Sequence, residues 1–181
     1  MKEREEFFLN PTIELTSESY EPKSILGIDP SSRWLGVRSC GSNNKPLFVG
    51  KQIRTTRGKY QYLRSQTQKK GSYDKFSDKK ANKVDYLIHK TTKWLSEYAK
   101  QNKLAIVVGD VKEINEESGK GRKFNHRVNT MPTHKLKRYL KYKCKERGVP
   151  FLLIDEAYTT QTCSNCGEKV GRPNSKEFKC P

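Results

Sequence analysis

The chain has 181 residues, a third of them hydrophobic, and this length suits one domain with a small appendage. Its 37 Lys and Arg residues outnumber 20 Asp and Glu residues, which gives a formal net charge of +17 at pH 7. No apolar run is long enough to cross a bilayer and no signal-peptide pattern is present, so we expect a cytoplasmic protein without a membrane partner. Five cysteines, two of them in a CxxC pair, favour metal binding over a disulfide framework.

The positive charge is concentrated in two segments. Residues 51–83 hold eleven basic and two acidic residues, and residues 118–147 hold eleven basic residues and one acidic residue. Like charges at this density repel, and a polyanion relieves the repulsion; interleaved aromatic residues favour nucleic acid over a merely solvated surface. From these segments we predict as nucleic-acid-binding residues Arg54, Arg57, Lys59, Lys69, Lys70, Lys120, Arg122, Lys123 and Arg127.

The first half of the chain begins with polar residues 1–24, which we expect to form a loose arm. Three short strands are predicted next, at Ile25 to Asp29, Trp34 to Cys40 and Leu47 to Ile53. Their short links favour antiparallel neighbours. Residues 54–82 are basic and turn-rich, with a helix predicted around Tyr60 to Gln68.

The second half alternates helices and strands. Apolar residues at three- and four-residue steps predict an amphipathic helix whose stripe holds Val84, Leu87, Ile88, Thr91, Trp94, Leu95 and Tyr98. The apolar run LAIVVGD at 104–110 is typical of a strand covered on both faces. A polar loop at 115–130, a second helix ending near Gly148 and a fifth strand at 151–155 follow. This order predicts a mixed α/β sheet with flanking helices, of the ribonuclease H-like class, in which the first and fourth strands are neighbours.

Acidic residues end three of these strands. Asp29 ends the first, Asp110 the fourth, and Asp155 with Glu156 the fifth. If the first and fourth strands are neighbours, we expect Asp29 and Asp110 to face each other, and paired carboxylates of this kind bind Mg²⁺ for phosphodiester cleavage. Taken singly, each acid also suits a turn or a helix cap.

The C-terminal segment carries thiols at metal-ligand spacing. Cys163, Cys166 and Cys180 follow a CxxC-x13-C pattern that suits a zinc ribbon with three of its four ligands, and Gly167 permits a knuckle turn. Cys40 and Cys144 lie on predicted elements, so we expect them in the core. His126 and His134 are candidates for a fourth ligand, although a lone histidine is more commonly a surface residue.

The stretches GIDPSSRWLGV, IVVGDVKEI and IDEAYTTQTCSNCG resemble the RuvC-type nuclease core and zinc ribbon of transposon-encoded TnpB (OrfB) proteins, relatives of type V CRISPR effectors. The resemblance spans residues 25–181. It implies a nuclease-type domain over residues 25–157 and a partial zinc ribbon over 158–181. Members are RNA-guided DNA endonucleases of insertion sequences, so it also implies DNA and guide RNA as partners and Mg²⁺ and Zn²⁺ as cofactors. Asp29 corresponds to the first catalytic aspartate, and Cys163, Cys166 and Cys180 to the first three zinc ligands.

The chain departs from the family pattern at its second acid. The family has a glutamate where this chain has Gly109, so either Asp110 substitutes directly or Glu156 supplies the carboxylate, and we hypothesise the latter. The family's third aspartate, its fourth zinc cysteine and its N-terminal lobe have no counterpart here, so we expect a truncated endonuclease domain with weak or no activity. The alternatives are a non-catalytic DNA- or RNA-binding module and a decayed transposase fragment.

Overall fold

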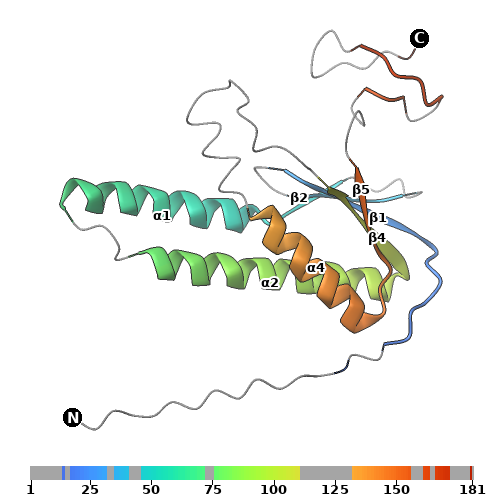
Figure 1. The fold of residues 1–181 in the computed structure, drawn as a ribbon, viewed down its shortest axis with the longest axis horizontal. Coiled ribbons are helices and arrows are strands. Elements are labelled where there is room, and N and C mark those ends of the chain that lie inside the picture. The colour runs from blue at the N-terminus through green and yellow to red at the C-terminus, as the bar shows by residue number, and fades with distance from the viewer. Residues whose placement is uncertain are drawn as a thin grey trace.

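The computed structural model describes residues 14, 17–31, 35–40, 46–71, 76–110, 132–155, 161–163, 166–171 and 180. The regular elements, in chain order, are β1 (Ser24–Pro30), β2 (Leu35–Ser39), β3 (Leu47–Val49), α1 (Lys51–Lys69), α2 (Ser77–Gln101), β4 (Leu104–Asp110), α4 (Thr133–Arg147) and β5 (Phe151–Asp155) (Figure 1). Among the helices described, none combines the length and apolar character that a bilayer crossing requires.

The strands form one mixed sheet with the order β3-β2-β1-β4-β5. The strand β1 is antiparallel to β2 and parallel to β4, and β5 continues the parallel part. The prediction that the first and fourth strands lie side by side is therefore confirmed. The five-stranded sheet with its helices is the ribonuclease H-like arrangement expected from the element order.

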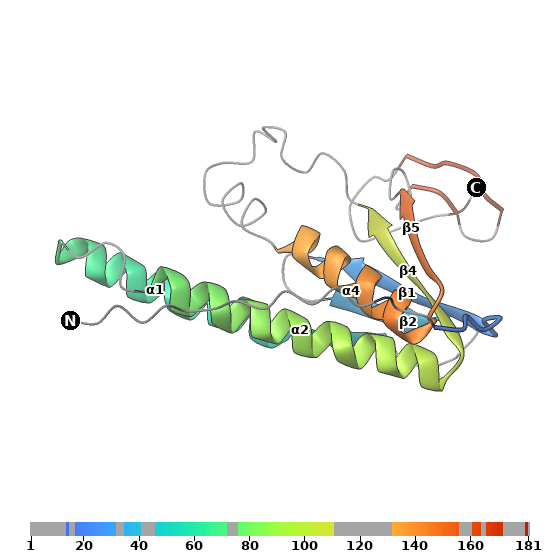
Figure 2. The same ribbon diagram turned by 60° about the horizontal axis from the view of Figure 1, so that its bottom comes forward.

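The helices α2 and α4 cover one face of the sheet, as Figures 1 and 2 show from two directions. The core lies in this layer, where Ile88 and Leu95 of α2 and Leu140 of α4 are fully buried against the sheet. The predicted stripe of α2 is largely confirmed. Trp94 is the exception, because it is 42% exposed, although its ring stacks on that of Tyr98.

The segment after β2 differs from the prediction. Residues 51–53 were expected to end the third strand, but that strand stops at Val49 and α1 begins at Lys51. Gly50 adopts φ 81°, a left-handed conformation that turns the chain out of the sheet and that glycine accepts without strain. Ile53 then packs into the core. The helix predicted around 60–68 is accordingly much longer, and α1 lies side by side with α2 (Figures 1 and 2).

The segment before β1 crosses the C-terminal end of α4. The Tyr20 hydroxyl donates a 2.7 Å hydrogen bond to the backbone at the start of β4, and Ser17 Oγ donates one to the carbonyl of Lys145. Gly148 ends α4 at φ 69°, and a Cβ there would collide with the carbonyl of Glu18. Residues 17–23 therefore pack against the end of α4 and the start of β4, although they belong to the loose arm predicted from the sequence.

Candidate functional site

The carboxylates of Asp29 and Asp110 lie at neighbouring strand ends but on opposite faces of the sheet. Ile28 and Val108 are partners in the β1–β4 register, and both are buried under the helices. Successive side chains of a strand alternate between faces. Asp29, one residue after Ile28, therefore lies on the face that none of the described helices covers, whereas Asp110, two residues after Val108, lies on the face covered by α2 and α4. The expectation that these two acids face each other is wrong, because a one-residue offset reverses the face.

Asp29 lies in an exposed position at the end of β1. Its partner on β2 is Gly36, and the next step of the β1–β4 register sets Gly109 beside it on β4. Gly109 in turn pairs with Ile154 on β5. On the face where Asp29 lies, the described positions of β4 and β5 beside it thus offer a glycine and an aliphatic side chain rather than a second carboxylate.

Asp110 is held by a lysine instead. Lys137 Nζ of α4 donates to Asp110 Oδ1 at 2.6 Å, and the two side chains are only 16% and 27% exposed. Asp155 is the register partner of Asp110 and shares its face, so the acids that the sheet brings together are these two. Asp29, Asp110 and Asp155 do not gather into a cluster that could hold a metal ion among the described residues. A Mg²⁺ site built on Asp29 and Asp110 therefore does not fit this geometry. Glu156, the third predicted catalytic residue, lies outside the described residues.

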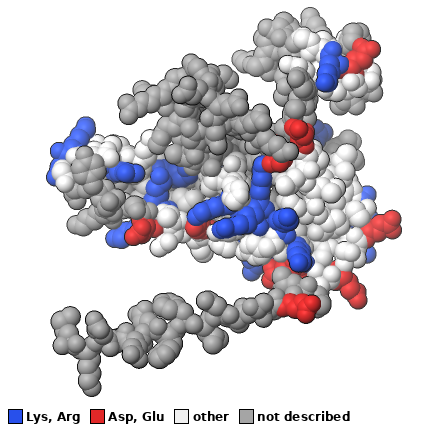
Figure 3. Space-filling view, in the orientation of Figure 1, with Lys and Arg blue, Asp and Glu red and all other residues white. Residues whose placement is uncertain are grey.

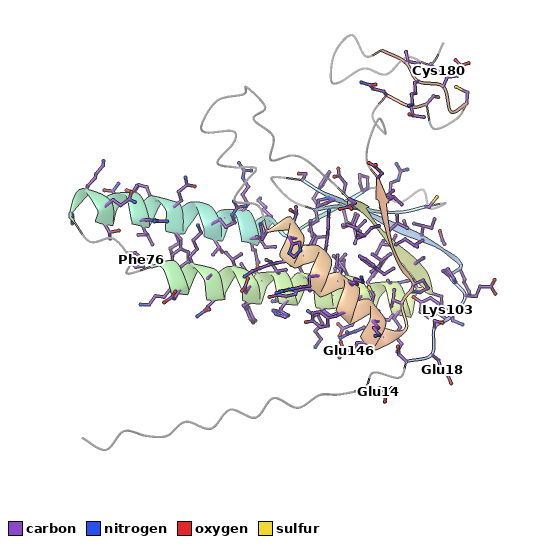
Figure 4. The ribbon with its side chains drawn as sticks, viewed as in Figure 1. Glu14, Glu18, Phe76, Lys103, Glu146 and Cys180 are labelled. Carbon is purple, nitrogen blue, oxygen red and sulfur yellow. The ribbon has the colours of Figure 1, made fainter. Side chains whose placement is uncertain are left out.

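The three C-terminal thiols do come together. The Sγ atoms of Cys163, Cys166 and Cys180 lie within 4.8 Å of one another, and Cys180 Sγ is 3.5 Å from each of the other two. Tetrahedral zinc with bonds of about 2.3 Å sets its sulfur ligands about 3.8 Å apart, so this donor set fits Zn²⁺. Figure 4 shows Cys180 beyond the end of β5, away from the helical layer.

The backbone around the cluster forms the turn that the sequence predicted. Gly167 adopts φ 78°, and its N–H donates a 2.9 Å hydrogen bond to the carbonyl of Cys163. Hydrogen bonds with Cys163 and Cys166 raise the pKa of the Cys180 thiol to about 11. The Cys180 thiol therefore holds its proton at neutral pH, and a cation bound by its sulfur would have to displace that proton.

Of the two remaining cysteines, one lies in the core as predicted and the other does not. Cys144 is fully buried in the core, as expected. Cys40 was expected there too, but it is exposed in the turn that ends β2. His134 is exposed at the start of α4, and His126 lies outside the described residues.

The basic side chains gather on the helices. Figure 3 shows Lys and Arg over α4 and the adjoining part of α2, whereas the sheet half of this face is mostly uncharged. Five of the predicted nucleic-acid-binding residues belong to α1 or its C-terminal cap: Arg54, Arg57, Lys59, Lys69 and Lys70. The other four, Lys120, Arg122, Lys123 and Arg127, lie outside the described residues.

Arg57 differs from the other four predicted binding residues of α1 and its C-terminal cap, which are exposed. It is half-buried in the wall of a cavity that Arg64 and Lys80 also line. Those two residues were missed in the sequence. The spacing of Arg57, Tyr60 and Arg64 over two helical turns was the available signal, and it depended on recognising α1 as a continuous helix.

The chain is similar in sequence to known proteins. A sequence model described as "Cas12f1-like, TNB domain" matches residues 134–181, which include all three clustered cysteines. A TnpB-like protein of Methanocaldococcus jannaschii is 28% identical over 108 residues, which make up 59% of this chain and 39% of that protein. A CRISPR-associated endodeoxyribonuclease Cas12f2 of a Micrarchaeota archaeon is 29% identical over 103 residues, 54% of this chain and 19% of that protein. The chain thus matches well under half the length of either relative.

Solved structures share the fold. The protein in a Cas12f1–sgRNA–target DNA complex superimposes with a TM-score of 0.62 at 18% identity, over 84% of this chain and 41% of that one. A CRISPR-Cas12f ternary complex gives a TM-score of 0.63 at 15% identity, over 87% of this chain and 33% of the other. At these identities the likeness concerns the arrangement of the sheet and helices.

Proposed function

We propose that this chain, which resembles the TnpB/Cas12f-like nuclease family, holds in residues 25–157 a RuvC-type domain that binds nucleic acid but cleaves DNA weakly or not at all. The observation that carries this proposal is the place of the acids. Asp29 has Gly109 as its neighbour on β4, and Asp110 is paired with Lys137 on the opposite face. Two-metal phosphodiester cleavage needs carboxylates on one face around the same ions.

We assign the remaining residues by their position. Asp29 keeps its role as the first acid, and Glu156 remains our proposed source of a second carboxylate, since it directly follows the end of β5. Residues 158–181 form the proposed zinc ribbon, with Cys163, Cys166 and Cys180 as ligands. Zinc bound there would supply a structural cross-link between the two halves of the ribbon. DNA and guide RNA are the partners that we propose from the family, as is descent from an insertion-sequence transposase.

A cleavage assay tests the catalytic half of the proposal. The purified chain is incubated with single- and double-stranded DNA and with Mg²⁺, beside the Asp29→Ala variant and an EDTA control. We expect little or no cleavage that depends on both Mg²⁺ and Asp29. Efficient Mg²⁺-dependent cutting that disappears in Asp29→Ala would overturn the proposal of a weak or inactive site.

A non-catalytic binding module is the second candidate, favoured by the basic helical face (Figure 3). Binding through phosphate contacts weakens steeply with salt because counterions are released. We expect nucleic-acid affinity that falls with salt and is unchanged in Asp29→Ala. A chain with no nucleic-acid affinity at low salt would instead favour the third candidate, a decayed transposase fragment.

A further inference from the structure

A cavity of about 300 Å³ lies between the middle of α1, the N-terminal part of α2 and the start of α4. This volume reaches the lower end of the range for small-molecule sites. The cavity lies in the helical layer, and its described lining includes neither the acids at the strand ends nor the clustered cysteines. Figure 4 shows Phe76, one of its wall residues, at the N-terminal end of α2 between the two long helices.

The wall carries an excess of positive charge. Arg57, Arg64, Lys80 and Lys135 line the cavity, and Asp85 is the acid among the described wall residues. Asp85 accepts 2.7 Å and 2.8 Å hydrogen bonds from Lys135 Nζ, so its charge is already compensated. Partial burial lowers the pKa of Lys80, and the nearby Arg57 and Arg64 lower it further. Cations crowded in this way are stabilised by a bound anion.

The same wall is also apolar and aromatic. Tyr60 and Phe76 are half-buried, and their ring centroids are 6.5 Å apart with the planes tilted by 56°. The rings therefore do not stack on each other. Ala81, Val84 and Pro132 complete the apolar part of the wall. A planar base can contact such aromatic surfaces, and every base can do so regardless of sequence.

Two helices begin at this cavity. Phe76 directly precedes α2 and Pro132 directly precedes α4, and both residues line the wall. No side chain of a described residue caps either helix. The N-terminal N–H groups of a helix carry partial positive charge, so they add to the positive field of the wall residues Arg57, Arg64 and Lys80.

We propose that this cavity binds one nucleotide of a single-stranded nucleic acid, with the base against Tyr60 and the phosphate held by Arg57, Arg64 and Lys80. The pairing of an aromatic wall with a cationic wall suits a nucleotide better than it suits phosphate alone, which would not use the rings. A base in a duplex is stacked and paired, so the cavity favours a single strand. This inference rests on the proposed nucleic-acid binding and names the part of the chain that carries it.

The test compares wall residues with matched neighbours in the full chain. Binding of fluorescein-labelled oligothymidylate and oligouridylate is measured by anisotropy for Lys80→Ala beside Lys79→Ala, an exposed lysine one residue earlier on α2. Tyr60→Ala is compared with Tyr62→Ala, whose ring is 64% exposed on the same helix. We expect the two wall variants to lose about tenfold in affinity each and the two neighbours to lose less than about threefold.

Folding and ligand source are controlled separately. Thermal unfolding checks each variant, and Tyr60→Leu, which fills similar space without an aromatic face, should lose the same affinity as Tyr60→Ala. Equal losses in wall and neighbour variants, with the wild type still binding, would overturn the cavity site while leaving the proposed function intact. Thymidine monophosphate or inorganic phosphate competing as well as the oligonucleotide would overturn the preference for a strand. Failure of the wild type to bind either oligonucleotide would instead contradict the proposed function itself.

Discussion

Lys137 of α4 donates a hydrogen bond to Asp110 at the end of β4, and this 2.6 Å contact joins the helical layer to the sheet edge. Because α4 covers one face of the sheet, the contact also shows that the Asp110 carboxylate lies on that face. The lysine at this helix–sheet contact balances the negative charge of the carboxylate without a metal ion. The short charge-assisted hydrogen bond between them contributes to stability.

The Lys137–Asp110 pair predicts a measurable loss of stability when it is broken. Lys137→Met removes the cation and leaves a largely buried carboxylate without it, so we expect the free energy of unfolding to fall by about 2 kcal/mol. Urea denaturation followed by circular dichroism measures the change. Lys135→Met is the matched control, because Lys135 and Asp85 are 44% and 30% exposed, and such pairs contribute less than about 1 kcal/mol. Equal losses for the two variants would contradict a special role for Lys137.

Replacing the glycine beside Asp29 with an acidic residue is expected to create a metal-binding site. Gly109→Glu places a carboxylate on the face of Asp29, so two acids could share one cation there. We expect Mg²⁺ at tenfold its dissociation constant to stabilise this variant by about 1.4 kcal/mol and to leave the wild type unchanged. Thermal unfolding with and without Mg²⁺ measures the effect.

Adding Asp29→Asn to Gly109→Glu should abolish the Mg²⁺ response. A response that survives in the double variant would show that the cation binds elsewhere. Gly109 is buried, so the new side chain is expected to cost stability in the absence of Mg²⁺. The readout is therefore the Mg²⁺-dependent shift within each variant rather than its absolute melting temperature.

The cysteine cluster predicts zinc binding that depends on each thiol. We expect Cys180→Ser to weaken Zn²⁺ binding by at least about a hundredfold, because a thiolate ligand is lost from a set of three. Competition with a chromophoric chelator gives the affinity. Cys40→Ser changes a thiol outside the cluster and should leave zinc affinity unchanged. An unchanged affinity in Cys180→Ser would rule out the proposed ligand set.

The buried thiol of Cys144 predicts a loss of stability in alkali. Burial raises the pKa of Cys144 from 9.0 to about 12. The unfolded thiol therefore ionises first, and the stability that this group contributes is complete below pH 9.0 and is lost as the pH rises towards about 12. The expected slope is about 1.4 kcal/mol per pH unit from this group alone.

Cys144→Ala removes that slope, so the difference in unfolding free energy between wild type and variant should shrink as the pH rises above 9.0. Burial also raises the pKa of Tyr20, and the nearby Cys144 raises it further, so Tyr20 adds a loss of the same sign that is smaller in the variant. Urea titrations at several alkaline pH values give the comparison. A constant difference between the two proteins across this range would contradict the prediction.

Much of the fold was predictable from patterns of apolar residues. The run at 104–110 and the stripe of α2 predicted an inner strand and its covering helix, because many of their apolar side chains form the buried core. The third strand and α1 were predicted less well. The basic sequence of α1 has Ile53 as its one buried residue, so its apolar pattern was weak. The turn at Gly50 depends on a left-handed conformation that the sequence permits without requiring it.

The acid site needed information that strand order alone does not contain. Neighbouring strands could be inferred, but the face of each carboxylate depends on register to the single residue, and a one-residue offset separates Asp29 from Asp110. The cysteines were easier, since CxxC spacing brings two ligands together through local chain geometry. Cys40 was misplaced because β2 ends at Ser39, one residue before it.

The close contact between Gly148 and the carbonyl of Glu18 has a practical meaning for work on this protein. Residues 17–23, ahead of the first strand, form a brace, in that they pack over the end of α4 and hydrogen-bond to it. Glycine at position 148 leaves room for this packing. A shortened version that starts at Ser24 would lose the brace together with the hydrogen bonds of Ser17 and Tyr20. The smallest unit that folds with full stability therefore begins no later than Ser17.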